Sequence, residues 1–325
     1  MKAIHYQKPG NPDVLKLIDI GKPKPKIKQV LIEVRAAGVN RPDLLQREGN
    51  YPAPKGHSKI LGLEVSGIIV SVGKGVIDFR IGDRVCALVD GGGYAEFCIA
   101  NEEQIIKISD KIDFVEASGI PECFFTCWAN IFEIGKLKKN QKVLIHGGGS
   151  GIGTTAIQML KLFDVETYVT VGSDKKKKLC EKLGAKMSSN YKKENFYIIF
   201  KNFLKPKGFN LILDMIGGDY IQKNIDLLEK DGKLINIAYQ KGSKVEVNMI
   251  KVMLKRLIIT GSTLRIRNLS FKKKIRDRLI KNIVPFIENG KIKPIVSDVF
   301  KLKDAAKAHR KMYESNHFGK IILKV

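Results

Sequence analysis

The chain has 325 residues, 44% of them hydrophobic, and a formal net charge of +25 at pH 7. This length suggests about two domains, and the apolar content excludes a disordered chain. The glycines follow no collagen period, no apolar run approaches the ~18 residues of a membrane helix, and the N-terminus lacks the apolar core of a signal peptide. We therefore expect a soluble, cytoplasmic protein without a membrane partner.

The basic excess raises the question of a polyanionic partner. A basic surface attracts nucleic acid, and it also suits a phosphorylated cofactor. Lysine occurs in almost every segment, which favours a charge that is dispersed over the surface. No motif combines aromatic and basic residues as RNA-binding motifs do. RNA binding is therefore kept only as an alternative.

Short β-rich segments, separated by Gly and Pro, occupy the first 110 residues. This pattern predicts a compact all-β unit. The predicted strands are Lys2–Tyr6, Val30–Val34, Ile60–Val72, Arg84–Leu88, Tyr94–Ile99 and Ile105–Ile108.

From residue 142 onward, predicted strands alternate with predicted helices, which favours a parallel, doubly wound sheet. A long helix over Phe271–Glu288 and a last strand over Lys320–Val325 follow. A cofactor-type domain would thus lie between two parts of a second domain. The central strands are Lys142–His146, Thr167–Val171, Asn210–Met215 and Lys233–Ala238, and the helices are 152–163, Lys175–Leu183 and Tyr220–Leu228.

A glycine-rich turn, HGGGSGIG over residues 146–153, joins the first central strand to its helix. Glycines let the backbone approach a pyrophosphate, and a helix N-terminus offers free N–H groups and the positive end of its dipole. The strict G-x-G-x-x-G spacing fails because Ser150 takes the middle Gly place. An ordinary strand–turn–helix therefore remains the alternative. His146 is expected to be a core histidine whose hydrogen bonds are satisfied.

The end of the second central strand bears on the choice of dinucleotide. NAD-binding proteins usually place an acid there to accept from the ribose 2′-OH. Here Gly172 and Ser173 precede Asp174 and the four lysines 175–178. One ammonium at 4 Å from a phosphate contributes about 4 kcal/mol at an effective dielectric of 20, before desolvation. We favour NADPH over NADH, although Asp174 could accept from a 2′-OH.

Two segments, GVNRPDL at 38–44 and GLEVSG at 62–67, resemble the medium-chain dehydrogenase/reductase superfamily. Its zinc alcohol dehydrogenases carry Cys at the place of Asn40 and His at the place of Leu63. Neither Asn nor Leu can replace a thiolate or an imidazole on zinc, and the four-cysteine zinc lobe is missing. The resemblance implies a member without metal. Cys123 and Cys127 are four residues apart among aromatic residues, which favours buried thiols over a metal pair.

Within that superfamily the chain resembles the zeta-crystallin-like quinone oxidoreductases, and most closely the tumour-suppressor-inducible branch. The resemblance runs essentially end to end. It implies an α/β fold with a GroES-like, β-rich catalytic domain and a Rossmann domain with a doubly wound parallel sheet. The implied limits are 1–121 and 266–325 for the former and 122–265 for the latter. The segments that carry it are 40–52, 60–67, 146–153 and 261–265.

The resemblance also implies roles for individual residues. Asn40 and Tyr51 would be catalytic, would donate hydrogen bonds to the quinone oxygen and would line the quinone pocket with Leu264. From the residues alone, Asn40 could equally be a turn former and Tyr51 a surface aromatic. Asp43 is expected to be a structural hydrogen-bond acceptor. The residues implied to contact NADPH are Asn40, Thr126 and Ile237 at the nicotinamide, Ser150, Gly151, Ile152 and Gly153 at the pyrophosphate, and Ser173, Lys176 and Tyr191 at the 2′-phosphate.

The implied activity is reduction of a quinone by NADPH without zinc. A quinone is already electrophilic, so it needs no metal to polarise it, and solvent could deliver the proton. Reduction of an activated alkene (an enone, a 2-alkenal or an enoyl thioester) uses the same cofactor geometry and is one alternative. A structural, crystallin-like or RNA-binding role is the alternative from another class. A predicted exposed strand, Leu257–Thr260, would pair across a two-fold axis and give a homodimer.

Overall fold

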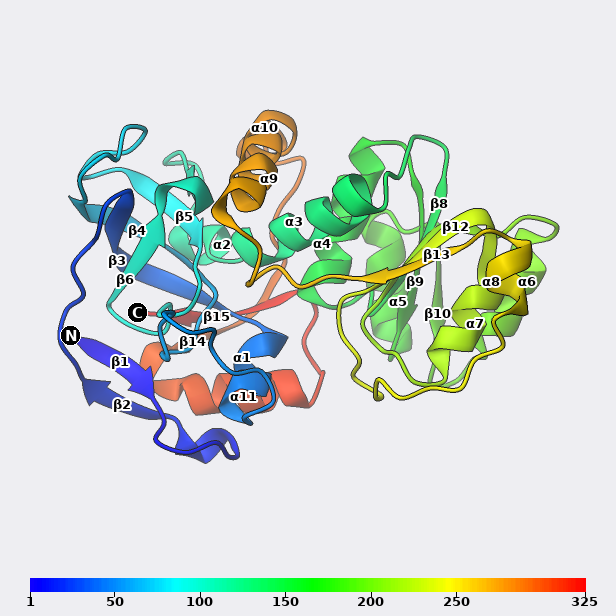
Figure 1. Ribbon diagram of the computed structural model, residues 1–325, viewed down its shortest axis with the longest axis horizontal. Helices are drawn as coiled ribbons and strands as arrows, with labels where there is room; N and C mark the ends of the chain where they lie inside the picture. The colour runs from blue at the N-terminus through cyan, green and yellow to red at the C-terminus, as the bar shows by residue number, and fades with distance from the viewer. The chain divides into compact units, whose positions relative to one another are not determined.

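The computed structural model describes all 325 residues, and they form two compact units. Unit 1 comprises Met1–Phe125 and Arg265–Val325, and unit 2 comprises Thr126–Leu264. Both ends of the chain, blue and red in Figure 1, therefore belong to unit 1. The domain limits after residues 121 and 265 remain a prediction. None of the helices has the length and apolar character that crossing a membrane requires.

Unit 1 is built on a β-sheet to which both ends of the chain contribute. The strands of the unit are β1 Lys2–His5, β2 Lys16–Asp19, β3 Gln29–Val39, β4 Glu64–Val72, β5 Arg84–Leu88, β6 Phe97–Asn101, β7 Ile105–Lys107, β14 Val296–Lys301 and β15 Lys320–Lys324. Of these, β1 and β2 pair only with each other, in a separate two-stranded sheet. The main sheet has the order β14-β15-β3-β4-β5-β7, and β6 also pairs with β3. Because β15 runs antiparallel to β3 and opposes Val39 with Ile321, the last residues of the chain lie beside the end of β3.

Helices and helical turns connect and cover these strands. They are η1 Pro12–Val14, α1 Arg41–Arg47, η2 Glu102–Gln104, α2 Phe114–Ala117, α3 Pro121–Cys127, α9 Leu269–Asn282, α10 Val284–Glu288, η4 Leu302–Asp304 and α11 Ala305–Tyr313. The division between the units falls within α3, after Phe125. The buried side of β3, with Val30 and Ile32 fully enclosed, packs in one core with Ala305 and Ala308 of α11.

The structure corrects two predictions for this unit. The first 110 residues are not all β, because α1 follows β3 directly. Asn40 is the N-cap of α1 and Pro42 lies in its first turn, where a missing N–H has no cost. The single helix predicted over Phe271–Glu288 is two helices, with Ile283 between them. Pro285 has no N–H to continue the first helix, so it begins a new one.

Unit 2 is an α/β unit whose six strands are all parallel. The strands are β8 Lys142–His146, β9 Glu166–Val171, β10 Met187–Asn190, β11 Phe209–Asp214, β12 Leu228–Asn236 and β13 Ile258–Gly261. Their order is β10-β9-β8-β11-β12-β13. The predicted doubly wound sheet is thus confirmed, and the switch in strand order beside β8 is where such sheets bind ligands.

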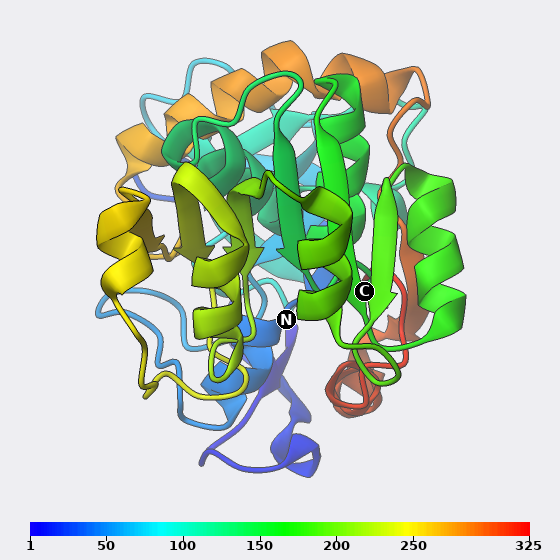
Figure 2. The ribbon, with the colours of Figure 1, turned by 90° about the vertical axis from the view of Figure 1, so that its right-hand side faces the viewer.

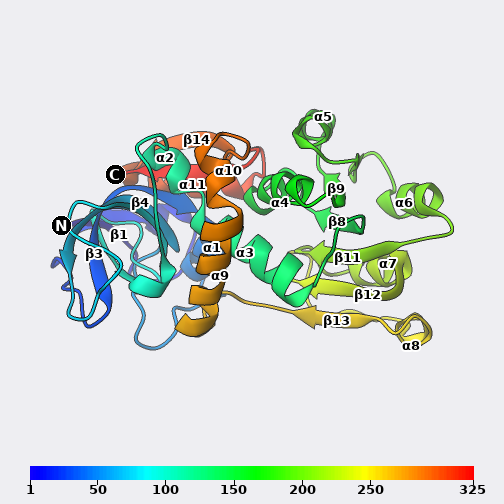
Figure 3. The same cartoon turned by 90° about the horizontal axis from the view of Figure 1, so that it is seen from above.

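Helices lie on both faces of this sheet. They are η3 Trp128–Ile134, a π-helical segment, α4 Gly151–Leu162, α5 Asp174–Leu183, α6 Phe196–Leu204, α7 Tyr220–Leu227 and α8 Ile250–Leu254. Figure 2 shows the strands side by side, and Figure 3 shows α4 on one side of them with α6 and α7 on the other. The core beneath α6 and α7 is aromatic, with Tyr168, Phe200 and Phe209 fully buried.

Candidate active site

The glycine-rich turn joins β8 to α4, as predicted. Ser150 is the N-cap of α4, and its Oγ accepts from the backbone N of Gly153 at 3.0 Å. A Cβ on Gly153 would lie 2.5 Å from the carbonyl oxygen of Gly147, so only glycine allows α4 to begin so close to the turn. The Ser150 hydroxyl therefore has a capping role at the position where the strict motif has glycine. The amides of Gly151 and Ile152, in the first turn, have no intrahelical acceptor and suit an anion.

His146 is a buried structural residue and not a base, as predicted. It ends β8 and is fully enclosed. Its Nδ1 lies 2.9 Å from Oγ1 of Thr170 and its Nε2 lies 2.8 Å from Oδ1 of Asn224. Burial lowers the pKa of His146, which keeps the ring neutral.

The residues predicted for the 2′-phosphate meet at the carboxyl end of β9. Ser173 is the N-cap of α5, and its Oγ accepts from the backbone N of Lys176 at 3.3 Å. Tyr191 follows β10, and its backbone N donates to the carbonyl oxygen of Val171 at 3.0 Å. A Cβ on Gly172 would lie 2.7 Å from the Tyr191 hydroxyl oxygen, so glycine allows that hydroxyl to cross the end of the strand.

A second lysine, which the sequence analysis did not single out, joins this group. A Cβ on Gly172 would lie 3.7 Å from Cε of Lys192, so the Lys192 side chain passes close to the same strand end. The pKa of Lys176 is lowered, first by burial of its side chain and also by the positive charge of Lys192. Two ammonium groups that repel each other are stabilised by a bound anion. We name Ser173, Lys176, Tyr191 and Lys192 the Gly172 cluster.

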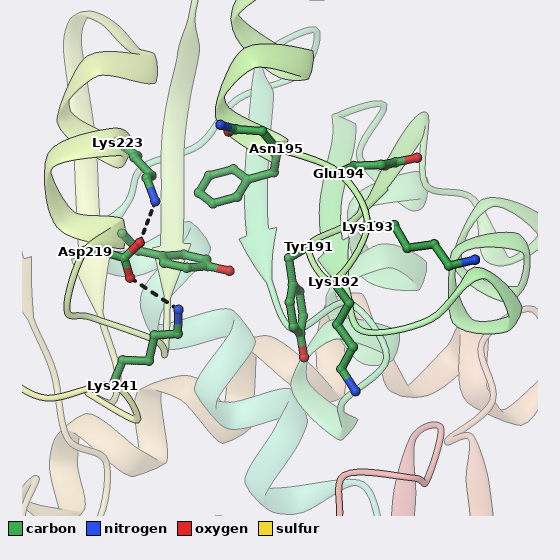
Figure 4. Close-up of a pocket in the computed structure, with 10 residues that line it drawn as sticks. Tyr191, Lys192, Lys193, Glu194, Asn195, Asp219, Lys223 and Lys241 are labelled. Atoms are coloured by element: carbon green, nitrogen blue, oxygen red, sulfur yellow. Dashed lines mark hydrogen bonds and ion pairs between the residues drawn. The ribbon is translucent and has the colours of Figure 1, made fainter.

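A cavity of about 380 Å³ extends from this cluster toward α7. Figure 4 shows Tyr191 and Lys192 on one side of it, with Lys223 and Lys241 on the other, where both reach the Asp219 carboxylate. The aromatic rings of Phe196 and Tyr220 also line the cavity. Aromatic walls with a cationic rim suit a flat ring that carries phosphate.

In unit 1 the predicted catalytic Asn40 belongs to a closed, buried network. Its Oδ1 accepts from Lys320 Nζ at 2.6 Å, and its Nδ2 donates to Glu64 Oε1 at 2.8 Å. Lys320 and Glu64 also form an ion pair of 2.5 Å. All three side chains are at least 93% buried, with exposed fractions of 7%, 3% and 0% for Asn40, Lys320 and Glu64. We name these three residues the Asn40 network.

This network narrows the predicted role of Asn40. The Asn40 carbonyl oxygen accepts from the Lys320 ammonium group, which favours the predicted donor role for the amide. The second N–H of the amide has only a long contact of 3.5 Å, with the carbonyl oxygen of Gly38. The amide therefore keeps one N–H that a substrate oxygen could accept.

Asp43 is a structural acceptor, as predicted. Its carboxylate accepts from the backbone N atoms of Asn40 and Gly62, at 2.8 and 3.1 Å, and from the Tyr94 hydroxyl at 3.1 Å. Burial raises the pKa of Asp43 to about 6, against these hydrogen bonds. Asp43 thereby ties α1, and with it Asn40, to the rest of unit 1.

Tyr51 is half-buried in the segment that follows α1. The Arg265 guanidinium lies 5.9 Å from the centre of its ring. Burial raises the pKa of Tyr51, and the Glu122 carboxylate raises it further. Glu122 itself was not predicted. Its backbone N donates to Glu64 Oε2 at 2.8 Å, and burial, followed by the charge of Glu64, raises its pKa to about 8.

The other predicted contacts lie in unit 2. Thr126 is 9% exposed near the end of α3, and its carbonyl oxygen accepts from Asn130 Nδ2 at 2.8 Å. Ile237 directly follows β12 and is half-buried, and Leu264, also half-buried, is the last residue of the unit. A pocket that combines these residues with Asn40 and Tyr51 stays a prediction.

The residues at the positions of the zinc ligands are enclosed and not grouped with other ligands. Leu63 is 3% exposed, and no three His, Cys, Asp or Glu side chains in the chain are arranged to hold a metal ion. Cys123 and Cys127 are both buried, as expected for core thiols.

The chain is similar to dehydrogenase domain families and to quinone oxidoreductases. Residues 26–110 match the family model of the alcohol dehydrogenase GroES-like domain, and residues 183–323 match that of the zinc-binding dehydrogenases. The quinone oxidoreductase of Rattus norvegicus is 32% identical over 99% of this chain and 97% of its own length, and that of Homo sapiens is 30% identical over the same shares.

Solved structures resemble the chain over its whole length. The quinone oxidoreductase of Escherichia coli, solved in complex with NADPH, has a TM-score of 0.89 at 26% identity and covers 100% of both chains. A protein described as an NAD-dependent alcohol dehydrogenase has a TM-score of 0.87 at 28% identity, also with 100% of both chains covered. The set of relatives therefore includes both dinucleotides, which leaves the choice between them to the residues of this chain.

Proposed function

The chain belongs to the zinc-free quinone oxidoreductases of the medium-chain dehydrogenase/reductase superfamily, and we propose that it reduces a quinone with NADPH. The observation that carries the cofactor choice is the Gly172 cluster. Two lysines, a serine hydroxyl and a tyrosine hydroxyl gather at the strand end where dinucleotide-binding folds hold the adenosine ribose. A 2′-phosphate requires positive charge and hydrogen-bond donors around it, whereas a 2′-OH does not require positive charge.

The residues present fit the rest of the dinucleotide. The free first-turn amides of Gly151 and Ile152 would hold the pyrophosphate at the start of α4, where Gly153 leaves room for the turn. The cavity beside Tyr191 would take the adenine ring. When bound, the nicotinamide supplies the hydride, and the protein supplies orientation and electrostatics.

At the substrate end, the Asn40 network fixes a hydrogen-bond donor. Negative charge develops on a quinone oxygen as the ring is reduced, and donors that are already oriented stabilise that charge without reorganising. Lys320 and Glu64 hold the Asn40 amide so that its remaining N–H can donate a hydrogen bond to the quinone oxygen. The Tyr51 hydroxyl would donate a second hydrogen bond, and its raised pKa keeps it protonated.

The test is a panel of acceptors under NADPH. The purified chain would be mixed with NADPH, a metal chelator and either a benzoquinone, a naphthoquinone, a cyclic enone or a 2-alkenal, and absorbance of the reduced nicotinamide followed. We expect rapid oxidation with the quinones that survives chelation. Turnover of the alkenes alone would replace the proposal by alkene reduction. No oxidation with any acceptor would overturn it.

We also propose that the enzyme is a homodimer in the cytoplasm. The edge strand β13 pairs on one side only, with β12, and it carries Ile258 and Ile259 at 50% and 39% exposure. An edge of this kind is a template for a second copy. None of the five cysteines forms a disulfide bond, which suits a reducing compartment. Sedimentation should give twice the monomer mass, and an Ile258→Lys variant should sediment as a monomer.

A further inference from the structure

Asp174, the acid that could have favoured NADH, is engaged within unit 2. Its Oδ1 accepts from Asn190 Nδ2 at 2.7 Å, and its Oδ2 pairs with Lys193 Nζ at 2.6 Å. Asp174 is the first residue of α5, directly after the N-cap Ser173. An acid at this strand end usually accepts from the 2′-OH of NAD. Here one carboxylate oxygen is bound by Asn190, the last residue of β10, and the other by Lys193, in the segment that follows.

The position of Asn190 directs its side-chain amide nitrogen toward Asp174. It is 2% exposed, it ends β10 and it opposes Val171 of β9 in the sheet. Its Oδ1 accepts from the backbone N of Lys192 at 3.2 Å, so its Nδ2 is left to donate to Asp174. Its backbone N donates to Glu194 Oε2 at 3.0 Å, which fixes the residue at a second point.

Lys193 supplies the charge that Asn190 lacks. An amide orients a carboxylate but leaves its negative charge in place, and that charge would repel a phosphate at the Gly172 cluster. The pKa of Asp174 lies below its usual range, first because of the hydrogen bond from Lys193 and next because of the one from Asn190. Asp174 is therefore ionised at neutral pH, and its charge is balanced by Lys193.

We propose that Asn190 and Lys193 determine the preference for NADPH over NADH by holding and neutralising Asp174. This inference rests on the proposed function. Without Asn190, the Asp174 carboxylate can turn toward the ribose and accept from a 2′-OH. Without Lys193, it repels a 2′-phosphate. Asn190 and Lys193 are thus positioning residues that act through Asp174.

The charged groups around Asp174 come from two segments. Lys177 of α5 affects its pKa and pairs with Glu194 at 2.9 Å. Lys193 comes from the segment after β10. Since Lys177 already has a carboxylate partner, the loss of Lys193 leaves Asp174 without its ion pair.

The decisive experiment measures the dissociation constants of NADPH and NADH, from the fluorescence of the bound nicotinamide, in a set of variants. Lys193→Met removes a side chain that is 68% exposed, so it should leave the fold intact. We expect NADPH to bind about two- to fivefold more weakly, as for an exposed ion pair, with NADH nearly unchanged. Adding Asp174→Asn to Lys193→Met should restore NADPH binding. Lys182→Met, an exposed lysine near the other end of α5, is the matched control and should change neither constant.

Asn190→Leu tests the second half of the proposal. It should lower the ratio of the NADH to the NADPH dissociation constant by about fivefold or more, because the Asp174 carboxylate gains a hydrogen bond from the 2′-OH of NADH and repels the 2′-phosphate of NADPH. Asp174→Asn in the same chain should cancel that shift, which a mere loss of stability would not do. A ratio that stays constant in both variants would overturn the inference while leaving the proposed function standing. A wild-type chain that binds neither dinucleotide would overturn both.

Discussion

The Asn40 network in unit 1 and the Gly172 cluster in unit 2 differ in burial and in how far apart in the sequence their residues lie. The network is closed except at one N–H of the Asn40 amide, which has only a long contact. The two partners of Asn40 come from positions 24 and 280 residues away from it. The cluster is open: its residues lie within twenty positions of one another, and Tyr191 is 43% exposed. Orienting one amide requires a buried setting in which neighbouring groups bind its other polar atoms. Capturing a hydrated anion requires cations that remain partly in water.

The two regions should therefore differ in what a mutation costs. A charge removed from a buried network leaves its partner uncompensated in a medium of low dielectric, so stability falls. A charge removed from a half-exposed cluster relieves repulsion in the free protein, so affinity for the anion falls and stability does not. The following predictions test this difference.

The largest expected effect is that of Lys320→Met. Glu64 would be left as a buried carboxylate without its cation, and Asn40 would lose the donor to its carbonyl oxygen. We expect a loss of about 3–5 kcal/mol in the free energy of unfolding, measured by urea denaturation. Lys324→Met, an exposed lysine of the same strand β15, is the control. Pairing Lys320→Met with Glu64→Gln should recover part of the loss, and a loss below about 1 kcal/mol for Lys320→Met alone would contradict a closed network.

Next comes Lys176→Ala in the open cluster. Removing one charged donor should raise the dissociation constant of NADPH by about 10- to 100-fold, the equivalent of 1.5–3 kcal/mol, with little change for NADH. The free energy of unfolding should stay nearly constant, in contrast to Lys320→Met. Lys178→Ala, exposed on the same helix, serves as the comparison. Equal weakening of both dinucleotides would remove the 2′-phosphate role from Lys176.

Tyr51→Phe should act on turnover alone. The ring and its contact with Arg265 remain, but the hydroxyl that would donate to the quinone oxygen is lost. We expect kcat to fall by about tenfold, which is one hydrogen bond of about 1.4 kcal/mol, while the NADPH dissociation constant is retained. Steady-state kinetics with a naphthoquinone would measure the first and fluorescence titration the second. A matched loss of cofactor binding would contradict the substrate-side assignment of Tyr51.

The smallest effect concerns the pH dependence near Glu122. Its pKa is raised from 4.5 to about 8 in the folded chain. Between those two values the unfolded chain releases this proton and the folded chain keeps it, so the contribution of Glu122 to stability falls as pH rises. Glu122→Gln removes that dependence. The variant should gain about 1 kcal/mol relative to wild type at pH 9, a value reduced for the partial solvent access of the carboxyl, and less at pH 5. Urea denaturation at both pH values checks this, and an equal difference at both would show that the Glu122 carboxyl is not perturbed.

The difference between the Asn40 network and the Gly172 cluster also explains which features the sequence could predict. Features that depend on adjacent residues could be predicted: the parallel sheet, the glycine-rich turn and a serine with a run of lysines at the end of β9 follow from local patterns. The choice of Ser173 and Lys176 for the 2′-phosphate came from the family resemblance. The short helix α1 was missed because its Asn-Arg-Pro start also fits a turn. The polar strand β10, which carries no apolar run, was missed as well, and with it the reason why Asp174 is engaged.

Features that depend on residues far apart in the sequence could not be predicted. Glu64 lies inside a segment that carries the family resemblance, yet nothing in that segment indicates that its carboxylate meets Lys320. The pairing exists because β15 runs beside β3, and only the tertiary fold sets that register. Glu122 had no signal beyond a proline before it. A buried carboxyl with a raised pKa is made by its surroundings and not by its neighbours in sequence.

The ratio of kcat/KM for NADPH to that for NADH, with one naphthoquinone and a chelator present, tests the central claim most directly. We predict a ratio of at least about ten in the wild-type chain, as one charge-assisted contact to the 2′-phosphate would give, and a ratio near one in Lys176→Ala. A wild-type ratio near or below one, with quinone turnover intact, would contradict the assignment of the Gly172 cluster to a 2′-phosphate.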